Sequence, residues 1–387
     1  MMNQESFYDI VIVGAGASGL MSACLLACSG KSVLVLEKES RVGRKLSATG
    51  NGRCNLTNLD MDWKHYYGDR SWVDTVLQQV SPERVIGVFE ELGVLTREKD
   101  GYVYPHSNQA ATVIGALYRG CRKPGITIEL EQRVTEVLRE PDRFEVVTED
   151  RSYECDTLLL ATGGPAGLEQ GGCDDGYGFL RSLGHTVTTV YPGLTGMHAA
   201  GRWWKDVAGT RVQGGFTLFV DGKRQGTEVG EIQITKTGVS GIPVFQMCRL
   251  AAEGLSSDKQ VYGEIDFVPA MDQVACERWI AMNGIEGLVP TKWIAVLGNG
   301  KKTAAQLAKE IKHFEFTITD TYGIEKAQVS AGGVPVGEVS PESFASRRCP
   351  GLYVLGELVD VDGLCGGYNL HLAWSSAILA TEDIKHA

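Results

Sequence analysis

Hydrophobic residues near the start of the chain form two short runs on either side of a glycine-rich turn. The runs Ile10–Val13 and Ser32–Leu36 have the length and β-branched content of buried strands. Residues 18–29 lie between them and predict a helix that opens at the glycines. Strand, helix and strand together have the size of a βαβ unit. The pattern therefore predicts an α/β fold with a parallel sheet.

Three glycines in that turn favour the binding of a dinucleotide. Gly14 permits a tight turn, Gly16 lets the backbone approach a pyrophosphate, and Gly19 lets the helix pack closely on the strand. The helix N-terminus offers unpaired N–H groups and its positive dipole end to phosphates. Glu37 ends the second strand, where a carboxylate can accept hydrogen bonds from a ribose diol. The alternative is a structural βαβ unit without a ligand.

Two features favour FAD over NAD as the dinucleotide. The motif begins near the N-terminus, and Ala23 extends it to GxGxxGxxxA. No second GxGxxG follows a strand later in the chain. A separate nicotinamide-binding domain is therefore not expected, and NAD(P)H is expected only as a transient electron donor.

The C-terminal segment carries a second glycine-rich turn. Leu352–Leu355 predicts a short strand, and Glu357 and Asp360 follow it where acids can meet ribityl hydroxyls. Glycines within residues 363–367 then open a helix expected over residues 369–384. A helix N-terminus aimed at the flavin N1–O2 edge would stabilise the anionic reduced ring. The alternative is a turn that only caps a terminal helix.

The middle of the chain has a different pattern. Residues 192–254 alternate as strands do, and Gly215–Val220 followed by Asp221-Gly222 predicts a hairpin. Residues 270–313 predict helices, with Thr303–Ala308 as the clearest run. The two dinucleotide-binding segments therefore flank a β-rich region with a helical part.

Several stretches resemble the BaiN/YhiN-like family of bacterial flavoproteins, which includes aminoacetone-oxidase-like members. The matching stretches are residues 43–58, 104–110, 161–164, 175–178, 331–334 and 350–370. The resemblance implies a two-dinucleotide-binding-type (Rossmann-like) FAD domain formed by residues 1–190 and 322–387. It also implies an inserted domain over residues 191–321. That domain is expected to combine a β-barrel-like part, at about 191–265 and 313–321, with a small helical subdomain at about 266–312.

The motifs and the resemblance together place the FAD. The expected cofactor-binding residues are Gly14, Ala15, Gly16, Ala17, Ser18, Gly19, Glu37, Lys38, Arg44, Lys45, Gly50, Asn51, Gly52, Arg53, Cys54, Asn55, Val134, Ala161, Thr162, Gly163, Gly356, Glu357, Asp360, Gly366, Gly367, Tyr368, Asn369 and Leu370. Val134 is included because related flavoproteins hold adenine through backbone groups at this position. Its alternative is an ordinary strand valine.

No residue is assigned to catalysis from the sequence. The weak candidates for a catalytic acid or base are His106, His371 and Tyr368. His371 follows the C-terminal motif and faces either the flavin or the core. Cys54 and Cys365 lie in flavin-contacting motifs, where small packing residues are expected rather than a redox disulfide.

Composition narrows the class of partner. The net charge of −11 argues against broad nucleic-acid binding, which needs a positive field. No apolar stretch reaches the roughly 18 residues of a membrane span, and no signal peptide is expected. The ten cysteines form no CxxC pair, so reduced thiols in a cytoplasm are expected, with no metal.

The resemblance implies an FAD-dependent oxidoreductase that transfers a hydride to or from a small organic substrate. The expected reaction is NAD(P)H-linked reduction of a conjugated C=C bond in a bile-acid-type 3-oxo-Δ4 steroid or a similar compound. The first alternative is an FAD oxidase of small amines or amino ketones that uses O2. An alternative of another class is a flavin-binding regulatory or RNA-associated protein. The sequence predicts neither the exact substrate nor the oligomeric state.

Overall fold

The computed structural model describes residues 6–298 and 302–386. It divides into two compact units. The first unit comprises the chain up to Val190 and again from Val329, and the second is Tyr191–Gln328. Each unit has its own hydrophobic core.

The return to the first unit lies later than the expected residue 322. The backbone N–H of Tyr322 donates to the carbonyl of Gly196 at 2.9 Å. The N–H of Gln328 donates to the carbonyl of Gly193 at 3.2 Å. These bonds tie the segment after the last strand of the second unit to the start of that unit, so the division falls at Val329.

The first unit is built on a sheet with the strand order β7-β2-β1-β10-β9-β8, and β19 also pairs with β10. Its strands are β1 (Ser6–Val13), β2 (Val33–Leu36), β7 (Ile126–Glu129), β8 (Val134–Arg139), β9 (Phe144–Thr148), β10 (Ser152–Leu160) and β19 (Leu352–Val354). The β7, β2, β1, β10 and β19 strands are parallel, whereas β8 and β9 form an antiparallel extension. The predicted parallel α/β sheet is confirmed.

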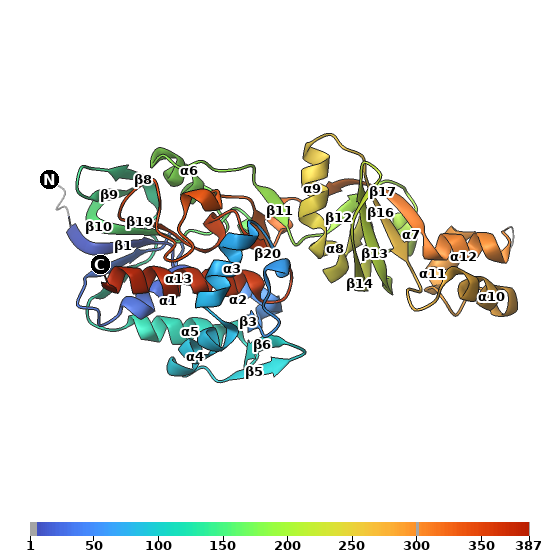
Figure 1. Ribbon diagram of the computed structural model, residues 1–387, viewed down its shortest axis with the longest axis horizontal. Helices are drawn as coiled ribbons and strands as arrows, with labels where there is room; N and C mark the ends of the chain where they lie inside the picture. The colour runs from blue at the N-terminus through green and yellow to red at the C-terminus, as the bar shows by residue number, and fades with distance from the viewer. Residues whose placement is uncertain (1–5, 299–301, 387) are drawn as a thin grey trace. The chain divides into compact units, whose positions relative to one another are not determined.

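Helices and short strands complete the first unit. The helices are α1 (Ala17–Leu26), α2 (Arg44–Gly52), α3 (Arg70–Gln79), α4 (Pro82–Glu91), α5 (Ala110–Cys121), α6 (Asp175–Ser182) and α13 (Tyr368–His386). The short strands are β3 (Thr57–Asn58), β4 (Tyr66–Tyr67), β5 (Thr96–Lys99), β6 (Tyr102–Pro105), β18 (Val329–Ala331) and β20 (Asp362–Gly363). Helices α1 and α13 lie side by side, although they come from opposite ends of the chain (Figure 1).

One helix of the first unit lies in a segment for which the sequence pattern predicts no helix. Residues 38–58 lack the apolar content of a core element, yet α2 forms within them. Gly43 begins this helix with a left-handed φ of 67°, and Leu46 is buried beneath it. The helical φ/ψ angles end at Thr49, so the segment is a short helix followed by an irregular loop.

The second unit is a closed barrel with the order β12-β15-β14-β13-β16-β17. Its strands are β11 (Tyr191–Gly193), β12 (Met197–Ala199), β13 (Arg211–Val220), β14 (Lys223–Thr235), β15 (Gly238–Ser240), β16 (Val261–Asp266) and β17 (Phe314–Thr321). Its helices are α7 (Trp204–Val207), α8 (Ile242–Gln246), α9 (Cys248–Ser256), α10 (Gln273–Asn283), α11 (Thr291–Leu297) and α12 (Ala304–Lys312).

Two local signals in the second unit are confirmed. Val220 pairs with Lys223 across the Asp221-Gly222 turn, which closes the predicted hairpin. The side chains of Thr303 and Gln306 form a reciprocal capping box that fixes the start of α12. The expected combination of an inserted β-rich domain and a small helical part is thereby confirmed.

Two kinds of feature are absent from residues 6–298 and 302–386. No helix there has both the length and the apolarity needed to cross a membrane. No three His, Cys, Asp or Glu side chains there are grouped so that they could hold a metal ion.

Candidate functional site

The glycines of the first βα turn differ in the space around them. Gly14 has a φ of 102°, and a Cβ there would lie 2.6 Å from the carbonyl oxygen of Ala161. A Cβ on Gly19 would lie 1.9 Å from the carbonyl oxygen of Gly14. A Cβ on Gly16 would meet nothing within 4 Å. The turn is therefore closed tightly at Gly14 and Gly19 and left open at Gly16.

Glu37 ties this turn to the end of β2. Its carboxylate accepts the backbone N–H of Ala15 at 2.7 Å and that of Glu39 at 3.0 Å. Burial raises the pKa of Glu37, and the two backbone hydrogen bonds oppose that rise. A carboxylate has about four acceptor positions, so capacity for further donors remains beside the open turn.

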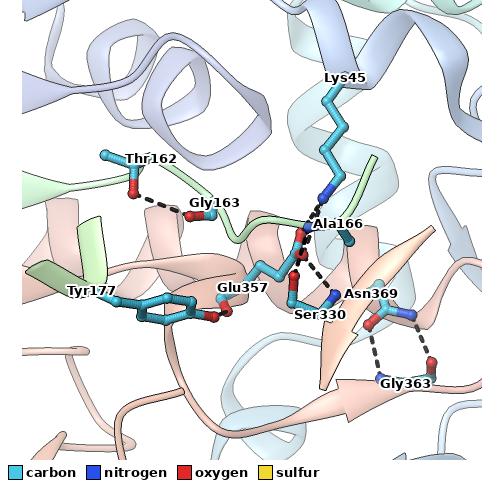
Figure 2. A network of polar contacts seen from close by, with 9 residues as sticks. All are labelled: Lys45, Thr162, Gly163, Ala166, Tyr177, Ser330, Glu357, Gly363 and Asn369. Atoms are coloured by element: carbon cyan, nitrogen blue, oxygen red, sulfur yellow. Dashed lines mark hydrogen bonds and ion pairs between the residues drawn. The ribbon is translucent and has the colours of Figure 1, made fainter. Parts of the chain in front are cut away.

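Four segments that are distant in sequence meet at Glu357. Nζ of Lys45 lies 2.8 and 3.0 Å from the two carboxylate oxygens of Glu357. Oε1 of Glu357 also accepts the N–H of Ser330 at 2.8 Å, and Oγ of Ser330 accepts the N–H of Ala166 at 3.0 Å. Figure 2 shows these side chains directed towards one another from separate elements. The junction joins the loop after β10 to the N-terminal and C-terminal parts of the first unit.

The turn before α13 is held by Asn369 of that helix and by β3. Oδ1 of Asn369 accepts the N–H of Gly363 at 2.8 Å, and Nδ2 donates to the Gly363 carbonyl at 2.6 Å (Figure 2). Nδ2 of Asn58 donates to the carbonyl of Gly366 at 3.0 Å. A Cβ on Gly367, whose φ is 97°, would lie 2.8 Å from the carbonyl oxygen of Thr57. The glycines thus let the turn lie directly against β3.

The irregular end of α2 and the loop that follows it contain both exposed and buried residues. Gly50 and Asn51 are exposed, and both have a φ of 56°. Cys54 is fully buried, and burial raises the pKa of its thiol to about 12. Burial likewise raises the pKa of Cys365 to about 12. Neither cysteine forms a disulfide within the described part of the chain, and both have the character of inert packing thiols.

The three weak catalytic candidates lie in different surroundings. His106 is exposed in the loop before α5. Tyr368 is buried at the start of α13, and its ring stacks on that of His65 with the centroids 4.6 Å apart. His371 is fully buried, with Nδ1 2.8 Å from Oγ1 of Thr57 and Nε2 3.0 Å from a backbone carbonyl. His371 therefore faces the core, and both of its ring nitrogens have protein partners.

The burial of His371 predicts a specific pH dependence of stability. Desolvation lowers the pKa of His371 to about 4, so the folded state favours the neutral ring. In the unfolded chain the pKa is about 6.5. The contribution of the neutral ring to the unfolding free energy is therefore complete above that pH and is lost as pH falls towards 4. We expect the loss to reach about 3 kcal/mol of unfolding free energy.

Urea unfolding between pH 7.5 and 4.5 tests this expectation. His371→Gln should be less stable than the wild type at pH 7.5 but should show a shallower decline on acidification. The exposed His106→Gln is the control, and it should keep the wild-type slope. Equal slopes for the wild type and His371→Gln would show that His371 does not contribute to the acid sensitivity.

The remaining expected cofactor residues lie in several other elements and loops of the first unit. Arg44 forms an ion pair with Glu39 and also donates to the carbonyl of Glu169 at 2.9 Å. Oδ2 of Asp360 accepts the hydroxyl of Thr188 at 3.1 Å. Others occupy element ends or turns, namely Ala17 and Ser18 in α1, Lys38 after β2, Gly52 and Arg53 at the end of α2, Val134 in β8, Ala161, Thr162 and Gly163 after β10, Gly356 after β19 and Leu370 in α13.

Sequence reasoning missed several residues of this region. Ser330 bridges Ala166 and Glu357, and Tyr177 donates from its hydroxyl to the Glu357 carbonyl at 3.3 Å. Asn58 binds the Gly366 carbonyl. Ser330 directly precedes the stretch 331–334, which resembles the family. This adjacency is the feature of the sequence from which a role for Ser330 could have been predicted.

Comparison with known proteins gives relatives that match nearly the full length of the chain. A 3-dehydro-bile acid delta(4,6)-reductase of Clostridium scindens is 36% identical, over 96% of this chain and 97% of the relative. A ribosomal RNA dihydrouridine synthase of Haemophilus influenzae is 29% identical, over 98% of this chain and 99% of the relative. The Escherichia coli ribosomal RNA dihydrouridine synthase is 26% identical, over 97% and 98%.

Solved structures share the fold at low sequence identity. FrdA of E. coli quinol fumarate reductase matches with a TM-score of 0.54 and 15% identity, over 99% of this chain and 70% of that one. The 3-ketosteroid-delta4-(5alpha)-dehydrogenase of Rhodococcus jostii matches with a TM-score of 0.50 and 12% identity, over 98% of both chains. The model of the HI0933-like protein Rossmann domain matches residues 8–383. The chain therefore belongs to the HI0933-like family of Rossmann-domain proteins.

Proposed function

We propose that this FAD-dependent oxidoreductase reduces a carbon–carbon double bond conjugated to a carbonyl group, with NAD(P)H as the electron donor. The observation that carries the proposal is the 36% identity over nearly the full length to a 3-dehydro-bile acid delta(4,6)-reductase. A 3-dehydro compound carries a ketone, and its Δ4 bond is conjugated with that ketone. A bile-acid-type 3-oxo-Δ4 steroid or a similar enone is the proposed substrate.

The residues of the first unit fit an FAD molecule. Positions Gly16 and Gly163 leave open space where a Cβ would stand, which suits the close approach of a ligand to the backbone. The Glu37 carboxylate keeps acceptor capacity for a ribose beside the first of these. Oδ1 of Asn55 is buried without a protein partner beside the turn at Gly367. We therefore propose the first unit as the FAD-binding domain and the second as its insertion.

Each part of this site has a proposed role toward the cofactor. Bound FAD would supply the hydride chemistry, and the protein would supply orientation and electrostatics. The N–H groups at the start of α1 would hold the pyrophosphate, and Glu37 the adenosine ribose. The junction of Lys45 and Glu357 would fix the ribityl segment. The start of α13 would place its positive dipole end at the pyrimidine edge of the flavin.

Half-reactions of the purified protein test the proposed reaction. Anaerobic addition of NADH or NADPH is expected to bleach a flavin band near 450 nm. Addition of a 3-oxo-Δ4 steroid without O2 is then expected to restore the band and yield one saturated product per flavin. If the enone leaves the flavin reduced while aminoacetone and O2 yield peroxide, the protein is an amine oxidase instead.

A second candidate reaction follows from the other relatives. Two proteins 29% and 26% identical to this chain are named ribosomal RNA dihydrouridine synthases. Uridine also has a C=C bond conjugated to a carbonyl. The bond that is reduced is therefore of the same kind, and only the substrate molecule that contains it differs. The net charge of −11 disfavours RNA as the substrate. Formation of dihydrouridine in an unmodified ribosomal RNA transcript would favour this candidate over the steroid.

A further inference from the structure

The side chain of Asn55 ends in a buried oxygen to which no group of the protein donates. Oδ1 of Asn55 is one of two such side-chain atoms within residues 6–298 and 302–386, and the other is Oγ of Ser22. A serine hydroxyl can rotate towards a new partner, whereas an amide oxygen moves only with its whole side chain. Because an unsatisfied buried acceptor destabilises the fold, this oxygen indicates a donor supplied by a ligand.

The backbone around Asn55 is fixed to the start of α13. Oγ1 of Thr57 lies 2.8 Å from Nδ1 of His371, and Nδ2 of Asn58 donates to the carbonyl of Gly366 at 3.0 Å. Both of these following residues thus use their side chains to hold β3 against the glycine turn. These contacts fix the backbone that follows Asn55, so its side chain extends from a defined position beside the turn.

The position of this oxygen limits which donor it can meet. A Cβ on Gly367 would lie 2.9 Å from Oδ1 of Asn55, so the oxygen lies directly beside the turn at Gly366 and Gly367. The first N–H groups of α13 have no acceptor within the helix. A ligand bound here meets backbone donors and, next to them, one amide acceptor. It must therefore present an acceptor and a donor on adjacent atoms.

The flavin ring carries this pair on its pyrimidine edge, where the O2 carbonyl is adjacent to the N3–H group. The adenine of FAD also has a donor beside an acceptor, but the adenosine end belongs to the βαβ unit and Glu37. Ribityl hydroxyls offer no fixed donor beside a carbonyl. The pyrimidine edge is therefore the part of FAD that matches the turn and Asn55 together.

We propose that Oδ1 of Asn55 accepts the hydrogen bond of the flavin N3–H and so selects the imide edge of the ring. The inference rests on the proposed binding of FAD in the first unit. It assigns to one atom a function in cofactor recognition that is separate from hydride transfer. A flavin that lacks the N3 proton should therefore bind poorly, whatever its redox competence.

Binding of N3-methyl-FAD to the wild-type apoprotein is the decisive experiment. Flavin fluorescence quenching gives the dissociation constants of FAD and N3-methyl-FAD without any turnover. We expect N3-methyl-FAD to bind at least about tenfold more weakly, because it loses the donor and also places a methyl group against Oδ1. Equal affinity for the two flavins would overturn the proposal, and no mutant is required for that comparison.

A variant then shows whether the side chain of Asn55 provides the acceptor for the flavin N3–H. Asn55→Ala is expected to weaken FAD binding about tenfold and to bring the affinities of the two flavins to within about twofold. Asn283→Ala is the matched control, because Asn283 is an exposed asparagine at the end of α10. The control should keep the full preference for FAD. Retention of that preference by Asn55→Ala would assign the N3–H to another acceptor and refute the proposal.

Failure of this inference can be separated from failure of the proposed function. If the wild-type protein binds neither flavin, FAD binding and this inference fall together. If it binds FAD in preference to N3-methyl-FAD but reduces no enone, the assignment of Asn55 stands and only the proposed reaction falls.

Discussion

Gly16→Ala is expected to abolish tight FAD binding while the apoprotein remains folded. A Cβ at this position meets no protein atom within 4 Å, and its φ of −82° and ψ of −156° are accessible to alanine. The methyl group would instead occupy the space through which the backbone approaches the pyrophosphate. We expect FAD affinity to fall on the order of a hundredfold, and stability to fall by no more than about 1 kcal/mol.

Gly19→Ala is expected to act on the fold rather than on the ligand. Its Cβ would lie 1.9 Å from the backbone carbonyl oxygen of Gly14, so α1 would have to move away from β1. Overpacking against backbone is expected to lower the unfolding free energy by about 3 kcal/mol or more. Thermal unfolding of the apoproteins and FAD titration measure the two effects separately.

Gly87→Ala in α4 is the control for this pair, because a Cβ there also meets nothing within 4 Å. It should bind FAD as the wild type does, and its stability should be unchanged or higher by up to about 1 kcal/mol. An unchanged FAD affinity in Gly16→Ala would show that the cofactor does not approach this turn.

The first turn could be predicted from the sequence because its glycines meet requirements that arise within one short segment. The turn itself requires the positive φ of 102° at Gly14, and a Cβ on Gly19 would meet the carbonyl oxygen of Gly14, so both requirements arise within one short segment. The further contact of Gly14 with Ala161 is not visible in that segment. The hairpin at Asp221-Gly222 and the start of α12 at Thr303 were predictable for the same reason. Local sterics and capping bonds require only residues that are close in sequence.

Other features depend on partners that no local pattern contains. Ser330 binds Ala166 and Glu357, and the first of these lies 164 positions away in sequence. The orientation of His371 does not follow from the sequence, because residues 371–381 of α13 are all buried and no polar face there distinguishes a core position from a ligand-facing one. Helix α2 was missed because Leu46 is its one buried residue, and because a left-handed Gly43 starts it.

The junction between Lys45 and Glu357 shows the same dependence on distant partners, and it is expected to govern both stability and FAD binding. Both side chains are partly buried, with 28% and 21% of their surfaces exposed, so the pair is screened less than a surface pair. Lys45→Met or Glu357→Gln should each lower the unfolding free energy by about 1–3 kcal/mol, which allows for the remaining exposure. Either change should weaken FAD binding on the order of tenfold or more, because the elements around the proposed ribityl site lose their common anchor.

A double-mutant cycle tests whether this pair acts as a unit. Lys45→Met combined with Glu357→Gln should cost less than the sum of the single changes, with a coupling of about 1–2 kcal/mol, because each single change leaves one charge without its partner. The exposed pair of Arg211 and Glu231 in the second unit is the control, and Arg211→Met should change stability by less than about 1 kcal/mol and leave FAD affinity unchanged. Strictly additive losses, or single variants that bind FAD like the wild type, would mean that the two ends of the chain are joined at the cofactor site by other contacts. The cycle therefore decides between two explanations of how the parts of the proposed FAD site are held together. Either the ion pair between Lys45 and Glu357, which are 312 positions apart in sequence, is required, or the packing of α13 against α1 is sufficient.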